Sequence, residues 1–236
     1  MLAVHTSAWR LGRADVLLPV LLILAMLVAA AGPFDLAVHL ASGGVPVRRI
    51  LLIAMLVIAG ATCASLSGLS MQGTSKTWPL IAIGSALGVA AYVCLVDGWL
   101  FRASVPAEYV HAVQMHPLRD RLAYYFLRAF QENVIYRMFV FSALTLAVSK
   151  LSGRSASEIS TAGILSIALT AQILNIAINV VALEPAASFS LTYDSVRFVV
   201  PGMFWGWLYW RHGFVTTELG HVACHAFLQP ALGILI

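Results

Sequence analysis

Long runs of apolar residues, separated by short polar or glycine- and proline-containing stretches, recur along the whole chain. A helix needs about 20 apolar residues to cross a bilayer, and seven runs approach or exceed that length. They cover residues 16–31, 50–69, 79–101, 121–150, 159–183, 196–210 and 214–236. Continuous apolar runs favour helices over the alternating pattern of a membrane β-barrel. The pattern therefore predicts an all-α fold, a polytopic membrane helix bundle of about seven transmembrane helices.

The small residues within these runs predict where helices approach each other. Residues 121–150 contain no proline or glycine. At 1.5 Å per residue such a helix is longer than a bilayer core is thick, so we expect it to be tilted or to begin at the interface. Gly84 and Gly88 form one pair four residues apart, and Gly202 and Gly206 form another. Each pair would let a neighbouring helix pack closely.

Composition agrees with a membrane protein and excludes a soluble domain. Of the 236 residues, 61% are hydrophobic and 10% are charged, whereas soluble domains carry about 25% charged residues. We therefore expect one integral membrane domain, residues 1–236, surrounded by membrane lipids. The net charge of +4 comes from basic residues that stand singly at the ends of apolar runs. That distribution is typical of membrane topology and not of nucleic-acid binding.

Three polar residues outside the apolar runs, or near their ends, are predicted to lie at the membrane surface. Asp97 is near the end of the third run and is expected to be interfacial. His111 and His116 belong to the most polar stretch, residues 102–120, where no helical pattern is evident. We interpret them as loop histidines and not as metal ligands.

The fourth run contains an acid, an amide and a base: Glu132, Asn133 and Arg137. Ionisable side chains are costly inside a membrane and usually face a partner or a wet cavity. Arg128 precedes Glu132 by four residues and shares its helical face. One interpretation is therefore a structural Arg128–Glu132 ion pair. The other is that Glu132 acts as a general base on a water molecule.

Two later runs carry further polar faces. In the fifth run, Gln172, Asn175 and Asn179 recur at spacings that place three amides on one side of a helix. In the last run, His221 and His225 are four residues apart, a spacing that presents two imidazoles to one ion or one water. Glu218 and Gln229 extend the same polar stripe.

If these polar faces meet in one cavity, they have the groups needed to hydrolyse an amide bond. Glu132 would take a proton from water, and His221 and His225 would orient that water or hold a metal. Amides such as Asn175 would donate hydrogen bonds to the oxyanion. The residues leave open whether a divalent metal such as zinc takes part. If one binds, His221, His225 and Glu132 are its expected ligands.

Two segments resemble motifs of a known family of intramembrane peptidases. Residues 130–137 resemble the Glu-Glu-x-x-x-Arg motif of the CAAX protease and bacteriocin-processing family, also called CPBP or Abi. Residues 206–213, followed by His221, resemble its last motif, in which a histidine is followed four residues later by Asn or Asp. The resemblance covers about residues 120–236.

The resemblance implies roles for individual residues. Glu132 matches the glutamate that activates water, Arg137 the motif arginine, and His221 the late histidine.

Three positions depart from the family pattern. Asn133 replaces the second glutamate, and His225 stands where Asn or Asp is expected. The histidine of the middle motif is missing, and Asn175 is its best match, with Asn179 second.

The resemblance implies an endopeptidase that cleaves a membrane-anchored peptide or protein, located in the cytoplasmic (inner) membrane of a prokaryote. Two alternatives stay open. The substituted motif positions would suit a non-catalytic relative that acts as a membrane scaffold or regulator. A small proton-coupled transporter would also use Glu and His inside the membrane.

Overall fold

The computed structural model describes residues 14–31, 35–181 and 190–236. Every regular element in these ranges is helical, which confirms the predicted all-α fold. The N-terminal part contains α1 (Ala14–Ala31), α2 (Leu36–Ser42), α3 (Pro46–Ser67), α4 (Trp78–Leu95), η1 (Val96–Leu100), η2 (Arg102–Ser104) and α5 (Ala107–Met115). The end of the fifth predicted run, residues 182–183, lies outside the described residues.

The C-terminal part supplies most of the site. It contains α6 (Leu118–Glu132), η3 (Asn133–Phe141), α7 (Ser142–Ser152), η4 (Ala156–Glu158), α8 (Thr161–Ile176), η5 (Ala177–Val181), α9 (Leu191–Asp194), η6 (Ser195–Val199), α10 (Val200–His212) and α11 (Phe214–Leu235). The elements η1, η3, η5 and η6 are π-helical, whereas η2 and η4 are 3₁₀ turns.

Four helices in the described ranges are long and apolar enough to cross a membrane: Pro46–Ser67, Trp78–Leu100, Leu118–Ser152 and Thr161–Asn179. A fifth span results if α1 and α2, which are bent by 80° relative to each other, are counted together. A membrane protein is thus supported, but the predicted number of about seven spans is not confirmed. The helix α10 has 13 residues and is short for a span. The 22-residue α11 carries the polar stripe, which lowers its apolar character.

The longest span confirms the uninterrupted helix predicted for residues 121–150. It runs from Leu118 to Ser152 through α6, η3 and α7. Gly153 ends it with φ of +67°, a left-handed conformation that favours glycine. Because η3 changes the register in the middle of this helix, the residues on either side do not follow a simple α-helical face.

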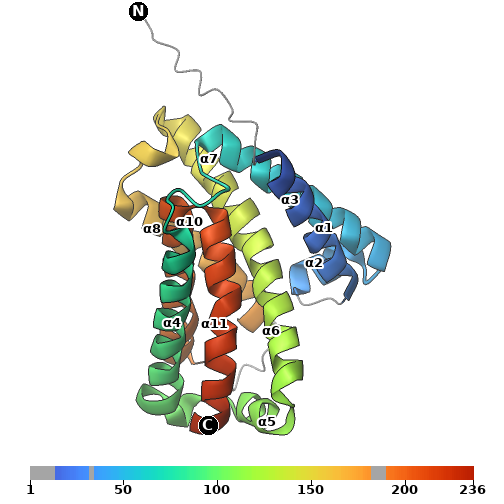
Figure 1. Cartoon of the computed structure of the whole chain (residues 1–236), viewed down its shortest axis with the longest axis vertical. Helices are drawn as coiled ribbons and strands as arrows, with labels where there is room; N and C mark the ends of the chain where they lie inside the picture. The colour runs from blue at the N-terminus through green and yellow to red at the C-terminus, as the bar shows by residue number, and fades with distance from the viewer. Residues whose placement is uncertain (1–13, 32–34, 182–189) are drawn as a thin grey trace, which may run out of the picture.

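The polar helix α11 lies between α4 and α6 (Figure 1). Helices α1 and α3 pack against each other at one side of the molecule, where α3 contacts η3 and α7. On another side, α8 packs against α10. The residues with the predicted chemistry, in α6, η3, α8 and α11, are therefore brought together in the interior.

The two glycine pairs behave differently. A side chain at Gly202 would collide with Gln172, and one at Gly206 would collide with Ala168, so the α10–α8 contact requires glycine, as predicted. A Cβ atom added at Gly84 or Gly88 would have no neighbouring atom within 4 Å, so no helix packs closely against these glycines. The prediction of close packing there is therefore wrong for the described residues.

Of the three residues predicted to lie at the surface, His111 and His116 are exposed, whereas Asp97 is buried. Asp97 is fully buried in η1, where it pairs with Arg197, so its predicted interfacial position is wrong. The partner arginine is 100 residues away in the sequence and gave no local signal. His111 lies within α5 and His116 directly follows it, so this region is a short helix and not a loop.

Candidate functional site

The five predicted site residues line one cavity. Its volume is about 490 Å³, within the range of about 300–1,000 Å³ typical of small-molecule sites. The wall contains Glu132, Arg137, Asn175, His221 and His225. They come from α6, η3, α8 and α11, which confirms that the three predicted polar faces meet.

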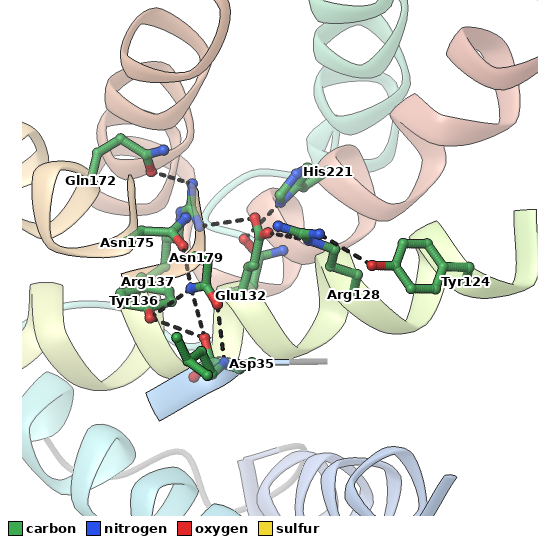
Figure 2. Close-up of polar contacts among 12 residues, drawn as sticks. Asp35, Tyr124, Arg128, Glu132, Tyr136, Arg137, Gln172, Asn175, Asn179 and His221 are labelled. Atoms are coloured by element: carbon green, nitrogen blue, oxygen red, sulfur yellow. Dashed lines mark hydrogen bonds and ion pairs between the residues drawn. The ribbon is translucent and has the colours of Figure 1, made fainter. Parts of the chain in front are cut away.

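Glu132 lies between two guanidinium groups (Figure 2). Arg128 Nε donates to Glu132 Oε1 at 3.0 Å, and a terminal nitrogen of Arg128 also donates to the Tyr124 hydroxyl. Arg137 Nη1 is 4.0 Å from Glu132 Oε2. The ion pair with Arg128 that the spacing suggested is therefore present, and it uses only one carboxylate oxygen.

The π-helical register explains the approach of Arg137 to Glu132. These residues are five apart, which in an α-helix places them on different faces. The π-helix bonds each residue to the fifth along the chain and so brings such a pair together. Gln172 Oε1 accepts a hydrogen bond from Arg137 Nη2 at 2.9 Å and fixes the other side of the guanidinium.

Asn133, which departs from the family motif, holds His221. Its Oδ1 is 3.0 Å from His221 Nδ1. An amide oxygen only accepts, so this contact places the proton on Nδ1 and leaves Nε2 of the neutral ring as an acceptor. Trp205 stacks on His221 with ring centroids 5.2 Å apart, and buried Glu218 lies beside the Asn133 amide.

His225 is held by ring packing instead. It stacks on Tyr125 with ring centroids 5.1 Å apart, and its centroid is 5.7 Å from that of His221. Its Nδ1 atom is buried and has no hydrogen-bond partner among the described residues. Since buried polar atoms normally have a partner, we expect water or a ligand beside this ring.

Asn175 belongs to a polar network that reaches Asp35, the residue before α2 (Figure 2). Asn179 Nδ2 lies 2.9 Å from Asn175 Oδ1, from Asp35 Oδ2 and from the Tyr136 hydroxyl. The hydroxyl of Tyr136 donates to Asp35 at 2.9 Å. Because Asn175 accepts through its oxygen, its amide nitrogen is left as a donor for the cavity that Asn175 lines.

A second polar cluster lies at another part of the cavity wall. Arg197 Nε donates to Asp97 Oδ2 at 2.8 Å, and the Tyr193 hydroxyl donates to Asp97 Oδ1 at 3.2 Å. Arg197 and Tyr193 line the cavity, whereas Asp97 stands behind them. No local spacing in the sequence indicates this cluster, because Asp97 and Arg197 are 100 residues apart.

The suggested metal ligands do not form a metal site. In the ranges 14–31, 35–181 and 190–236, no three His, Cys, Asp or Glu side chains are grouped closely enough to hold an ion. Glu132 faces two arginines, and His221 Nδ1 faces an amide.

Comparisons with models of known protein families, with curated proteins and with solved structures found no match. What the site can do follows from its own groups. It combines the Glu132 carboxylate, two imidazoles and several amide and guanidinium donors around a space that accepts a small ligand or a chain segment. General base catalysis with stabilisation of an oxyanion needs these kinds of groups.

Proposed function

We propose that this chain is an intramembrane endopeptidase of the CAAX-protease (CPBP) type, which uses a glutamate-activated water to cleave a membrane-anchored substrate in a prokaryotic cytoplasmic membrane. The observation that carries the proposal is the meeting of Glu132, His221, His225 and Asn175 in one cavity, although they come from three separate stretches of the chain. A structural ion pair alone needs neither the imidazoles nor the amide.

The space between Glu132 and Arg137 suits the attacking water. Glu132 Oε2 and Arg137 Nη1 are 4.0 Å apart, which is too far for a hydrogen bond. Arg137 Nη1 is also buried without a hydrogen-bond partner among the described residues. A water that donates to Oε2 and accepts from Nη1 would satisfy both groups. It would be held by the base that deprotonates it.

The proposed reaction begins when Glu132 takes a proton from this water and the oxygen attacks the peptide carbonyl carbon. The carbonyl oxygen becomes an oxyanion, to which the Asn175 amide nitrogen and the Arg137 guanidinium donate hydrogen bonds. His221 Nε2 accepts a hydrogen bond and orients the water. When the C–N bond breaks, the proton held by Glu132 passes to the leaving nitrogen, which becomes the new amine.

The test is cleavage of membrane-anchored reporter peptides by the purified protein in liposomes. We expect Glu132→Gln and His221→Ala to lower the rate constant by about 10²- to 10⁴-fold, the usual contribution of general acid–base catalysis. Asp120→Asn and His116→Ala are matched controls, because these two side chains are exposed and lie away from the cavity. Cleavage at the wild-type rate in both Glu132→Gln and His221→Ala would refute the proposal.

One observation favours the alternative of a non-catalytic scaffold. The Arg128–Glu132 ion pair at 3.0 Å is sufficient by itself to keep Glu132 inside the membrane. A scaffold predicts that the double variant Arg128→Met/Glu132→Met keeps its cellular role, since replacing both members of a buried pair by apolar residues is often neutral. A peptidase predicts that the role is lost although the protein folds.

A further inference from the structure

The second polar cluster on the cavity wall is built around one oriented arginine. Asp97 is fully buried and binds Arg197 through Nε, and Tyr193 occupies the other carboxylate oxygen. The guanidinium carbon lies 5.1 Å from the centre of the Phe198 ring, which restrains it from one side. Arg197 is therefore held by Asp97 and by Phe198, and it also lines the cavity.

The orientation leaves one edge of the guanidinium for a ligand. Asp97 accepts its hydrogen bond from Arg197 Nε, so the edge that carries the two terminal nitrogens is not hydrogen-bonded to that carboxylate. The Tyr109 hydroxyl lies beside Arg197, and Tyr109 also lines the cavity. Two parallel N–H groups match the two oxygens of a carboxylate, which is the geometry of bidentate recognition.

The surrounding wall limits the ligand further. Val93, Trp205 and Leu228 line the cavity and are buried apolar side chains from three helices. The acidic residues Glu108 and Asp194 also line it. They would repel a doubly charged phosphate from a single arginine that is already paired, whereas one negative charge is compatible with the site.

We propose that the Arg197 end of the cavity is a binding site for a monocarboxylate attached to an apolar body. The free C-terminus of an apolar peptide and a fatty acid share this chemistry. Arg197, His225 and Glu132 line the same cavity, so a ligand bound at Arg197 has space to extend toward the Glu132 part. Binding at this site does not require the proposed hydrolysis, because it depends only on the Arg197 charge and on the apolar wall of the cavity.

Isothermal titration of the purified full chain in dodecyl maltoside tests this site. N-acetyl-trileucine with a free carboxylate is compared with its C-terminal amide, and octanoate is compared with octanamide. We expect a carboxylate to bind at least about tenfold more tightly than its matched amide, as a charge-assisted hydrogen bond provides. Binding of the peptide alone, of octanoate alone or of both supports the site and identifies its source of carboxylate. Equal affinity for each carboxylate and its amide, or no binding, overturns it.

Two variants connect the binding to this cluster. Asp97→Asn/Arg197→Gln removes both charges together and so avoids an unpaired buried acid, and it should lose the preference for carboxylate. Tyr109→Phe leaves the ion pair intact and should weaken carboxylate binding by a smaller factor. Arg119→Gln is the control, since the Arg119 side chain is 87% exposed. A folded double variant that binds as wild type overturns the proposal, and if that variant does not fold, unchanged binding by Tyr109→Phe does so.

Discussion

At the scale of single residues, the site is organised by partners that do no chemistry themselves. Gln172 holds Arg137, and Asn133 holds His221. Both partners are amides, which can accept from a donor and leave a second group for another contact. Arg137 and His221 are thus oriented by neutral side chains that stay polar without adding further charge to the membrane interior.

Replacing one of these amides should show how much it contributes to the free energy of unfolding. In Gln172→Met the side chain keeps its length, but the Arg137 guanidinium loses the acceptor at 2.9 Å. We expect the free energy of unfolding to fall by about 1–3 kcal/mol, the cost of an unsatisfied buried donor. Unfolding in mixed detergent micelles with increasing dodecyl sulfate measures it. Ile173→Met is the control, because Ile173 is 53% exposed on the same helix; equal stability of the two variants would contradict the assignment.

The residues of the site could be predicted from the sequence better than their contacts. The i,i+4 spacing predicted the Arg128–Glu132 pair, because those residues lie in regular α-helix. The Glu132–Arg137 approach was missed because it depends on the π-helical register of η3, for which periodicity gives no signal. Asp35 and Arg197 were missed because their partners, Tyr136 and Asp97, are about 100 residues away.

At the scale of elements, glycine decides how closely α8 and α10 approach. Gly202 faces the Gln172 side chain without space for a methyl group, whereas Gly84 of α4 faces open space. Both are helical glycines, so alanine should improve helix propensity by about 1 kcal/mol at either position in the absence of contacts.

The two positions therefore provide a matched test. Gly202→Ala should lower the melting temperature, because a collision with Gln172 displaces the side chain that holds Arg137. Gly84→Ala should leave it unchanged or raise it slightly. Thermal unfolding followed by circular dichroism measures both variants. A similar decrease in both would show that the α8–α10 contact has no special need for glycine.

At the scale of the whole molecule, the N-terminal layer of α1 and α3 is joined to the rest at a backbone contact. Gly60 of α3 lies so close to the main chain of Met138 and Phe139 in η3 that a side chain would overlap it. Backbone atoms cannot move aside as a flexible side chain does. The layer is therefore seated directly against the π-helical segment that carries Arg137.

Gly60→Leu should separate this layer from η3 and reduce both stability and peptide cleavage. We expect the cleavage rate of the folded fraction to fall, because η3 positions Arg137 beside Glu132. Thr62→Leu is the control, since Thr62 is exposed on the same helix. Reporter cleavage, normalised to folded protein by size-exclusion chromatography, gives the comparison. Normal cleavage in folded Gly60→Leu would show that the layer is independent of the site.

The sequence predicted the membrane class and the all-helical fold from hydrophobicity, which depends on local composition. The predicted number of about seven spans is not confirmed among the described residues, because polar residues buried in α11 and the short α10 do not meet the length and apolarity of a span. Burial of a polar stripe against neighbouring helices is a tertiary property. A hydrophobic pattern does not separate it from exposure to lipid.

The four π-helical segments in the described part of the chain have one more consequence. Each contributes a polar residue to the cavity or directly behind it: Asp97 in η1, Arg137 in η3, Asn179 in η5 and Arg197 in η6. A π-turn behaves as one inserted residue, so converting it to α-helix would advance the following helix by about 100° and 1.5 Å. The polar lining of the cavity therefore depends on the helical register that the π-turns set. Such a change would leave every helix formed but would turn its polar residues away from the cavity wall.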